Sequence, residues 1–419
     1  MTEERLEADY LIETAVDPHS AAEAMAGEQS SGTFIALPGE SPELKGRSAA
    51  RVERLDVIGE VNHPSLPTSG MLKSDASKRL QAKVTLSWPS ANVNASLTNL
   101  LATVAGNLYE LKQFSGLRIL DIRLTPDFKA RYRGPKFGVA GTLAKAGLQQ
   151  GPLIGTIIKP SIGLTSDETA SLVKDLCDAD IDFVKDDELQ VDARHCSFDE
   201  RVRAVMRVIR AHRDRTGKTV MYAFNLTGEL DDMRRRHDLV KSEGGTCIMA
   251  SLNSVGLVGV IELARHTELP IHGHRNGWGY LSRHPLLGWD YVAWQKIWRL
   301  AGVDHMHVNG IGNKFSESDE SVIRSARAVL SPLFVDHAAL AMPVFSSGQT
   351  IRQAHPTFMA LKHADLIFAA GGGIMAHPGG PGDGMRSLRE AWRAAMSGVS
   401  LEDAARSSKI LRQAMETFP

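Results

Sequence analysis

The stretch Asp182-Phe183-Val184-Lys185-Asp186-Asp187-Glu188 joins an apolar strand start to a lysine and three consecutive carboxylates. Because side chains alternate between the two faces of an extended strand, Lys185 and Asp187 are expected on one face and Asp186 on the other. Glu188 follows the strand end and can turn back toward Asp187. Carboxylates beside such a strand end suit Mg²⁺, which binds one or two of them and keeps water for a substrate. Taken alone, the stretch also fits a solvated acidic turn.

Short apolar runs that end in polar residues or glycine recur throughout the chain after residue 150. Helical stretches with apolar spacings of three and four separate them, as in residues 198–213, where Val202, Val205, Met206 and Ile209 share a face. Eight strand–helix units in about 250 residues predict an α/β fold, the (β/α)₈ TIM barrel. A doubly wound open sheet is the alternative, although it usually needs fewer parallel units. The runs are 154–159, 183–187, 220–225, 246–251, 270–274, 305–309, 343–346 and 366–370.

The first 140 residues lack this regular alternation of strand and helix. Their strands and helices interleave irregularly, which predicts an α+β N-terminal domain over residues 1–140 and a barrel domain over 141–419. Pro135 and the glycines around it mark residues 133–138 as a linker. The expected strands are 6–14, 51–61, 82–88 and 117–124, and the expected helices are 19–27, 96–106, 387–396 and 401–415.

The overall composition narrows the class of protein. A formal net charge of −1 gives no bulk attraction to nucleic acid or to an anionic membrane, so neither is expected as a partner. No apolar run approaches the roughly 20 residues that span a bilayer, and the acidic N-terminus lacks the apolar segment of a secretion signal. The three cysteines show no CxxC spacing, which fits a reducing compartment. We therefore predict a cytoplasmic protein.

Polar residues gather where the predicted strands end. In barrels of this kind the catalytic groups lie at the C-terminal strand ends, so this gathering predicts an active site. The residues at these ends are Lys159, Lys185, Asp187, Glu188, Asn225, His272, His274, Arg275, His305, His307, Ser346, Ser347 and Gly348, together with Gly371, Gly372 and Gly373. Among them Lys159, Lys185 and His274 are the catalytic candidates.

The residues after the last two strands predict an anion site. Glycine allows the backbone N–H groups of Ser346-Ser347-Gly348 and Gly371-Gly372-Gly373 to approach a phosphate, and barrels commonly bind phosphate there. Arg275 and His307 can supply charge to the same or a second anionic group. A metal and neighbouring cations would lower the pKa of Lys159 and make it a usable acid or base. The alternative for Lys159 is a structural salt bridge.

Lys185 raises a specific question, because a charged ammonium would repel a divalent metal rather than bind it. A neutral, desolvated lysine could instead add carbon dioxide and become a carbamate with oxygen ligands. Lys185, Asp187 and Glu188 would then offer three oxygen ligands and leave positions open for a substrate. A metal held this way would polarise a carbonyl and stabilise an enediolate.

These motifs closely resemble those of ribulose-bisphosphate carboxylase large subunits, over nearly the whole chain. The resemblance implies Mg²⁺ held by a carbamylated Lys185 with Asp187 and Glu188. It also implies a homodimer whose active sites borrow Glu28, Thr33 and Asn107 from the neighbouring subunit. The motifs are GEQSSGTF (27–34), Gly106-Asn107, GTIIKPSIGL (155–164), FVKDDE (183–188), His272-Gly273-His274-Arg275, His305-Met306-His307, Lys314, Ser346-Ser347-Gly348 and Gly371-Gly372-Gly373.

Four departures from the family pattern argue against carbon fixation. Ser161 stands where a true carboxylase has a second lysine, and Phe34 stands where the family has tryptophan. The segment His307-Val308-Asn309-Gly310 replaces His-Ser-Gly-Thr, and Gly348-Gln349 replaces a pair of glycines. The chain thus resembles a RuBisCO-like protein in which enolisation and metal chemistry survive and gas addition does not.

Known activities of such relatives lead to the predicted function. Residues 26–34 most resemble the decarboxylases and transcarboxylase/hydrolases that act on 3-oxo-isoapionate 4-phosphate in apiose breakdown. We therefore predict a Mg²⁺-dependent enzyme that removes the carboxyl group of a phosphorylated 3-oxo acid sugar through an enediolate. One alternative is an enolase or isomerase of methionine salvage, acting on a 2,3-diketo-5-methylthiopentyl 1-phosphate. The other is a non-catalytic binding or regulatory relative.

Overall fold

The structure, a computed structural model, describes residues 4–32, 39–67 and 78–418. Its chain folds into two compact units. One unit takes the residues up to Arg133 together with Gly277–Trp298 and Leu333–His337, and the other takes Gly134–Asn276, Arg299–Pro332 and the residues from Ala338 onward. The domain boundary at residue 140 remains a prediction. It does not include the two later segments, Gly277–Trp298 and Leu333–His337, that belong to the first unit.

The first unit is built on a five-stranded sheet in the order β10-β4-β1-β3-β2. The central strand β1 (Arg5–Thr14) pairs antiparallel with β3 (Arg79–Pro89) and β4 (Phe114–Arg123). Along β1 every second side chain is buried, as the pleat requires. The edge strands are β2 (Arg51–Val61) and the three-residue β10 (Leu287–Trp289). Its helices are α1 (Pro18–Glu28), α2 (Pro42–Ser48), α3 (Ser90–Val93), α4 (Leu97–Val104), η1 (Leu108–Glu110), α5 (Asp127–Arg131) and α11 (Trp278–Ser282).

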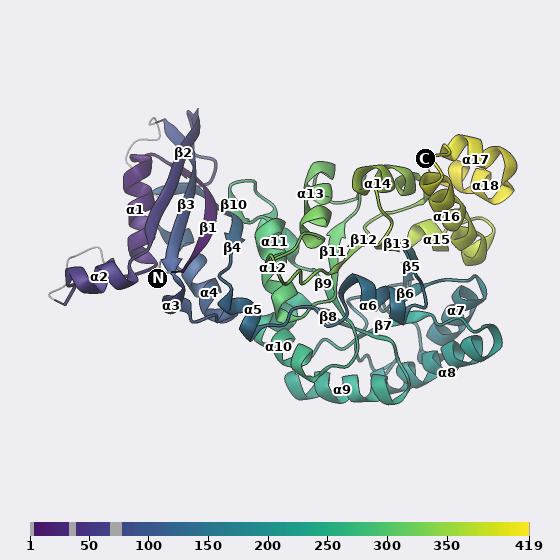
Figure 1. Ribbon diagram of the computed structural model, residues 1–419. Helices are drawn as coiled ribbons and strands as arrows, with labels where there is room; N and C mark the ends of the chain where they lie inside the picture. The colour runs from purple at the N-terminus through teal and green to yellow at the C-terminus, as the bar shows by residue number, and fades with distance from the viewer. Residues whose placement is uncertain (1–3, 33–38, 68–77, 419) are drawn as a thin grey trace. The chain divides into compact units, whose positions relative to one another are not determined.

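The second unit is a closed barrel of eight parallel strands, which confirms the predicted fold (Figure 1). Each predicted apolar run overlaps one barrel strand, with β5 and β12 beginning one residue before their runs, and neighbouring strands in space follow the chain order. The strands are β5 (Leu153–Ile157), β6 (Phe183–Lys185), β7 (Met221–Asn225), β8 (Cys247–Ser251), β9 (Ile271–His274), β11 (His305–Asn309), β12 (Met342–Phe345) and β13 (Ile367–Ala369).

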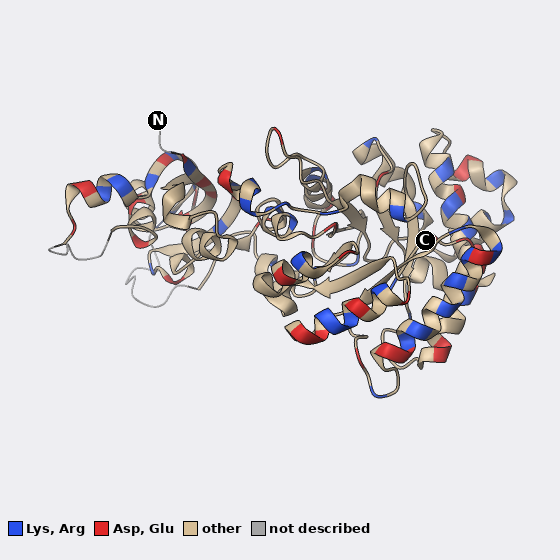
Figure 2. Cartoon of the chain, turned by 60° about the horizontal axis from the view of Figure 1, so that its bottom comes forward, with Lys and Arg blue, Asp and Glu red and all other residues tan. Residues whose placement is uncertain are grey.

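Helices with one apolar face surround this barrel. The predicted face of α8 (Phe198–Thr216), which carries Val202 and Ile209, is buried. Charges of both signs lie along the outer helices (Figure 2), and ion pairs such as Arg235–Asp199 (2.8 Å) join neighbouring helices. The other helices are α7 (Ser166–Asp178), α9 (Leu230–Ser242), α10 (Leu252–His266), α13 (Asp319–Val329), η2 (Ile351–Gln353), α14 (Ala354–Leu361), α15 (Gly372–Met375), α16 (Gly380–Met396), α17 (Leu401–Ser407) and α18 (Lys409–Thr417). The helix α12 (Tyr291–Ala301) belongs to the first unit up to Trp298 and to the second from Arg299.

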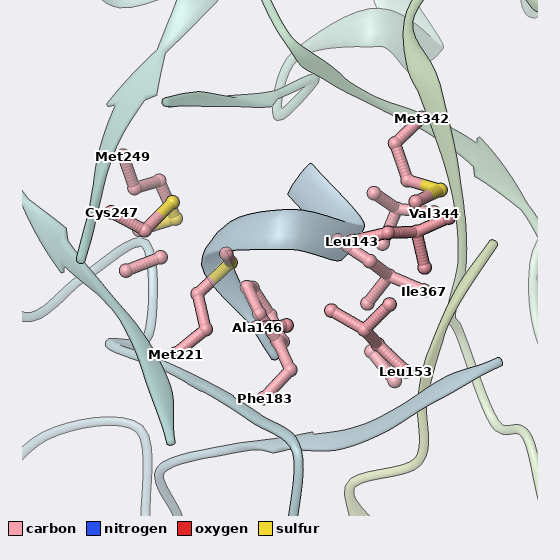
Figure 3. Close-up of a cluster of buried hydrophobic side chains, with 12 residues drawn as sticks. Leu143, Ala146, Leu153, Phe183, Met221, Cys247, Met249, Met342, Val344 and Ile367 are labelled. Atoms are coloured by element: carbon pink, nitrogen blue, oxygen red, sulfur yellow. The ribbon is translucent and has the colours of Figure 1, made fainter. Parts of the chain in front are cut away.

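The beginnings of the strands are closed by an apolar plug. Leu143 of α6 (Gly138–Lys145) and the adjacent Ala146 pack among the first residues of several strands (Figure 3). This cluster includes Leu153, Phe183, Met221, Cys247, Met249, Met342, Val344 and Ile367. Apolar side chains thus fill most of this end, and the charged candidates predicted from the sequence lie toward the opposite end, where the strands finish.

One predicted helix was wrong in detail. Residues 401–415 form two helices, because Ser408 leaves the helical conformation at φ −119° and ψ 116°. Its hydroxyl instead accepts a hydrogen bond from the backbone N–H of Leu411 (3.2 Å) and caps α18. Among the residues described, no helix is long and apolar enough to cross a membrane.

Candidate active site at the strand ends of the barrel

Lys185 is the last residue of β6, and only 1% of its side chain is exposed. Its Nζ donates to the backbone carbonyl of Asp186 (2.8 Å) and lies 3.7 Å from Glu188 Oε2. Burial lowers the pKa of Lys185 below its ordinary value, against the opposing effect of the nearby carboxylates. The site therefore favours the neutral amine more than water does, which is the condition for adding carbon dioxide.

Lys159 and Asp187 meet across the ends of β5 and β6. The parallel register pairs Ile157 with Lys185, so the residues two positions further along each strand come together. The Nζ of Lys159 donates to Asp187 Oδ2 (2.7 Å) and to Ser161 Oγ (2.8 Å). Asp187 is buried, whereas 43% of the Lys159 side chain is exposed. The salt bridge considered as an alternative for Lys159 is thus present, and its partner is the proposed metal-binding carboxylate.

Asp186 points away from this cluster, which confirms the expected alternation along the strand. Its carboxylate is fully buried and accepts from Arg201 Nη2 (3.2 Å), from the Tyr222 hydroxyl (2.6 Å) and from the backbone N–H of Asn225 (2.9 Å). These bonds anchor the strand end between Lys185 and Asp187. Sequence reasoning missed the roles of Arg201 and Tyr222, because neither lies at a strand end.

Glu188 lies between two nitrogen groups. Its Oε2 is 3.4 Å from His274 Nε2 and 3.7 Å from Lys185 Nζ. His274 Nδ1 accepts from the backbone N–H of Asn276 (3.2 Å), so the imidazole proton is on Nε2 and faces Glu188. Burial lowers the pKa of His274 to about 3, which keeps the ring neutral. The structure therefore brings together Lys159, Lys185, Asp187, Glu188 and His274.

The anion-binding candidate Arg275 is already paired. Its Nη2 lies 2.6 Å from Glu317 Oε2, on the segment that follows β11. The same oxygen accepts from Asn309 Nδ2 (3.1 Å). Asn309 has a φ of 74°, a left-handed conformation that asparagine tolerates better than most residues, at a position where the family pattern has glycine.

The segments after the last strands approach each other closely, as an anion site would need. The backbone N–H of Lys314 donates to the Ser347 carbonyl (3.3 Å), and Ser346 Oγ lies 3.1 Å from His307 Nδ1. A side chain at Gly373 would bring its Cβ within 2.4 Å of the Gln349 carbonyl, so this contact requires glycine. Gly371 and Gly372 have no such steric requirement.

The candidates predicted in the first unit lie apart from these strands in the sequence. Glu28 ends α1, and its Oε1 accepts from Asn107 Nδ2 (3.2 Å), so these two side chains meet on the surface of that unit. Thr33 lies outside the described residues.

One other cluster of ligand-type side chains occurs within the described parts of the chain. His237, Asp238 and His266 offer ligand atoms within 4.8 Å of one another. However, His237 Nε2 accepts from the backbone N–H of Glu268 (3.3 Å), so its proton is on Nδ1, facing Asp238 Oδ1 (2.9 Å). The nitrogen that would have to bind a metal is therefore protonated, and we assign the cluster no metal.

Two features together define the class of this protein. One is a closed eight-stranded parallel barrel with lysines and carboxylates at its strand ends, and the other is a mixed five-stranded sheet. A family model described as "Ribulose bisphosphate carboxylase large chain, catalytic domain" matches residues 138–418. A second, described as the N-terminal domain of the same chain, matches residues 5–128. The chain belongs to the ribulose bisphosphate carboxylase large-chain family.

Three relatives narrow the comparison within that family. The chain is 61% identical to a 3-oxo-isoapionate-4-phosphate transcarboxylase/hydrolase of Xanthobacter autotrophicus, covering 98% of this chain and 99% of the relative. It is 40% identical to a 3-oxo-isoapionate-4-phosphate decarboxylase of Rhizobium etli, covering 98% and 97%. The crystal structure of a rubisco-like protein from Burkholderia fungorum superposes with a TM-score of 0.94 at 46% identity, covering 99% and 100%.

Proposed function

We propose that this chain is an enzyme that removes the carboxyl group of a phosphorylated 3-oxo acid sugar, with 3-oxo-isoapionate 4-phosphate as its substrate. The observation that carries the proposal is the 61% identity, over nearly the full length of both chains, to a transcarboxylase/hydrolase named for that substrate. The lower identity of 40% to a decarboxylase named for it favours the transcarboxylase/hydrolase among the two reactions. Methionine-salvage chemistry is the second candidate, as an enolase or isomerase.

Mg²⁺ is the proposed cofactor, bound by a carbamylated Lys185 with Asp187 and Glu188. The residues fit this ion. Lys185 is buried and its pKa is lowered, and Glu188 lies 3.7 Å away with a carboxylate oxygen facing it. A lysine carbamate and two carboxylates form an all-oxygen set, which hard cations prefer. When bound, the ion would supply Lewis-acid polarisation of a substrate carbonyl.

The proposed roles of the protein groups follow from their partners. Lys159 lies 2.7 Å from Asp187, and its partly exposed ammonium can deliver a proton to the substrate carbon that gives up the carboxyl group, which passes to another substrate carbon in a transcarboxylase or is released as carbon dioxide in a decarboxylase. His274 is neutral and directs its Nε2–H at Glu188, which fixes the direction of that carboxylate. Removal of the carboxyl group thus depends on one charged lysine and one neutral histidine on either side of the carboxylates.

The proposed anion site consists of charged side chains and backbone N–H groups near the ends of β9, β11, β12 and β13. Arg275 and Lys314 would supply positive charge, and the tight turns would supply N–H groups. The prediction that His307 supplies charge is wrong, because burial lowers the pKa of His307 well below its ordinary value and keeps the ring neutral. The residues are Arg275, His307, Lys314, Ser346, Ser347, Gly348, Gly371, Gly372 and Gly373. Glu28, Thr33 and Asn107 are proposed to complete the site of a partner chain in a cytoplasmic homodimer.

The test is turnover of the named substrate with Mg²⁺, using substrate labelled with ¹³C in its carboxyl group. We expect turnover in which the label remains in an organic product and water is consumed, as transcarboxylation with hydrolysis requires. Release of the label as inorganic carbon would favour the decarboxylase. Turnover of the diketo methylthiopentyl phosphate alone, with no reaction of 3-oxo-isoapionate 4-phosphate, would overturn the proposal in favour of methionine-salvage chemistry.

A further inference from the structure

Three histidines form a file through the interior of the barrel. His307 Nε2 lies 2.7 Å from His272 Nε2, and His272 Nδ1 lies 3.3 Å from His305 Nδ1. All three rings are buried, with at most 4% of any of them exposed. The register between β9 and β11 pairs His272 with His305, which sets these contacts. The file thus links the strand ends of the barrel to its interior.

Each end of the file meets a hydroxyl group. Toward the strand ends, His307 Nδ1 lies 3.1 Å from Ser346 Oγ. Toward the plugged end, His305 Nε2 lies 2.9 Å from the hydroxyl of Thr142 on α6. That hydroxyl also forms a short hydrogen bond to the backbone carbonyl of Gly138, one helical turn earlier. The file therefore ends at a carbonyl oxygen.

The carbonyl fixes the direction of every hydrogen bond in the file. A carbonyl only accepts, so Thr142 must donate to Gly138 and must accept from His305 Nε2–H. A neutral imidazole carries one N–H, and burial lowers the pKa of all three rings. His305 Nδ1 consequently accepts from His272 Nδ1–H.

The same reasoning continues to the other end of the file. Since the proton of His272 is on Nδ1, its Nε2 accepts from His307 Nε2–H. His307 Nδ1 is then an acceptor, and the hydroxyl of Ser346 donates to it. The thiol of Cys247 takes no part in this assignment, because its hydrogen is donated to the backbone carbonyl of Pro270 (3.4 Å). Ser346, His307, His272, His305 and Thr142 thus form one chain of hydrogen bonds, in which each group donates to the next.

The file cannot conduct protons across the barrel, because the amide carbonyl of Gly138 does not take up a proton at ordinary pH. The file instead fixes the orientation of the hydrogen-bond donors and acceptors along it. With Thr142 in place, the Nε2–H of His307 faces inward and the hydrogen of Ser346 is directed at His307. Without an acceptor at Thr142, His305 Nε2–H would be a buried donor without a partner, which is unfavourable. Reversing every bond in the file would relieve that cost.

We propose that Thr142 is a positioning residue of the candidate active site, whose hydroxyl sets the tautomers of His305, His272 and His307 and thereby the direction of the Ser346 hydroxyl. Thr142 lies on the plugging helix, at the opposite end of the barrel from the substrate candidates, so it acts only through the file. Its importance for turnover rests on the function proposed above. The assignment of the tautomers does not depend on the proposed function.

The chain offers a matched control for Thr142. Thr169 on α7 is also buried, and its hydroxyl likewise donates to a carbonyl one helical turn earlier, that of Thr165 (2.8 Å). Its hydroxyl makes no hydrogen bond to a histidine. Thr142→Val and Thr169→Val therefore remove the same group from the same kind of helical site, while Thr142→Ser keeps the hydroxyl.

The decisive measurement is the tautomer of each ring, from long-range ¹H–¹⁵N NMR of histidine-labelled protein at neutral pH. Signals are assigned with His272→Gln, His305→Gln and His307→Gln. We expect the wild type to carry the proton on Nε2 in His305, on Nδ1 in His272 and on Nε2 in His307. Thr142→Val should reverse all three, and Thr142→Ser and Thr169→Val should leave them unchanged. A wild-type His307 protonated on Nδ1 would overturn the proposal, even if Thr142→Val does not fold.

Kinetics then measure the consequence for the active site. We expect Thr142→Val to lower KM for 3-oxo-isoapionate 4-phosphate severalfold, because the reversed file lets His307 Nδ1–H donate to Ser346 Oγ and leaves the Ser346 hydrogen free for an anionic substrate group, with the wild-type KM retained in Thr142→Ser. Three unchanged tautomers in folded Thr142→Val would contradict the proposal whatever the kinetics. Absence of turnover by the wild type would contradict the proposed function alone, because the tautomers are read without substrate.

Discussion

Lys159 and Asp187 form an ion pair of 2.7 Å across the ends of two neighbouring barrel strands. The pair joins the candidate acid to a candidate metal ligand, so replacing either residue removes the charged partner of the other. Asp187 is buried, and its second oxygen accepts from the backbone N–H of Leu189 (3.1 Å), which holds the carboxylate in place while Lys159 reaches outward. A partly exposed cation beside a fixed anion suits a group that must deliver a proton to a substrate.

Replacing either member of this pair should nearly abolish turnover. We expect Lys159→Met and Asp187→Asn each to lower kcat by about a hundredfold or more, because each removes charge that stabilises the transition state. Lys174→Met is the control, since Lys174 forms an ion pair of the same 2.7 Å length with Asp178 on an exposed helix. If kcat of Lys159→Met stayed within threefold of the wild type, Lys159 would be a structural partner only.

Lys185→Arg should eliminate activity while preserving the fold. A guanidinium stays protonated and cannot add carbon dioxide, so no carbamate would form. The wild type, incubated with ¹³C-bicarbonate and Mg²⁺, should show a carbamate signal by ¹³C NMR that Lys185→Arg lacks. Lys218→Arg serves as the control, because Lys218 is likewise bonded to a buried carboxylate, that of Asp182 (2.8 Å), which precedes β6 at the end opposite Lys185. Substantial activity in Lys185→Arg would refute the carbamate.

The enzyme should not fix carbon on ribulose bisphosphate. The position that carries a second lysine in true carboxylases holds Ser161, whose hydroxyl accepts from Lys159 and adds no positive charge. Incubation with ribulose 1,5-bisphosphate, Mg²⁺ and ¹⁴C-bicarbonate should leave no label in acid-stable product. A true carboxylase run in parallel establishes that the assay detects fixation. Label incorporated above the no-enzyme background would contradict the reasoning from Ser161.

The sequence predicts the features that depend on local patterns of apolar and polar residues. Alternation along β6 predicts that Asp186 turns away from Lys185 and Asp187, and its bonds to Arg201 and Tyr222 confirm this. Apolar runs with polar ends likewise predict the eight barrel strands.

Other features depend on which elements become neighbours. The contact between His272 and His307 follows from the register of two strands more than thirty residues apart in sequence. The three-residue strand β10 is too short to carry a pattern, and it joins a sheet formed mostly by the first 123 residues. The pairing of Arg275 with Glu317 was also missed, because Glu317 lies beyond a strand end.

Glu317 should weaken substrate binding by competing for Arg275. Its carboxylate lies 2.6 Å from the guanidinium, where an anionic substrate group would have to displace it. Glu317→Gln keeps an oxygen that can accept from Asn309 but removes the competing charge, so KM should fall severalfold with little change in kcat. Glu320→Gln, on the exposed side of α13, is the control. A rise in KM would mean instead that Glu317 holds Arg275 in its binding position.

Acid should destabilise the barrel through its buried histidines, and His305 allows this to be measured. Burial lowers the pKa of His305 from 6.5 to about 3. Because the folded value is the lower one, the unfolded chain binds more protons between these two pH values. The stability that this histidine contributes is therefore complete above about pH 6.5 and is lost as the pH falls toward 3.

The expected slope for one such group is about 1.4 kcal/mol per pH unit well below pH 6.5. Urea unfolding of the wild type and of His305→Gln, measured from pH 7.5 to 4.5, should give free energies of unfolding whose difference narrows by that slope as the pH falls. His19→Gln replaces an exposed histidine of α1 and should run parallel to the wild type. A constant difference between the wild type and His305→Gln across this range would show that His305 becomes protonated within the folded barrel, and the directed histidine file could not then exist at low pH.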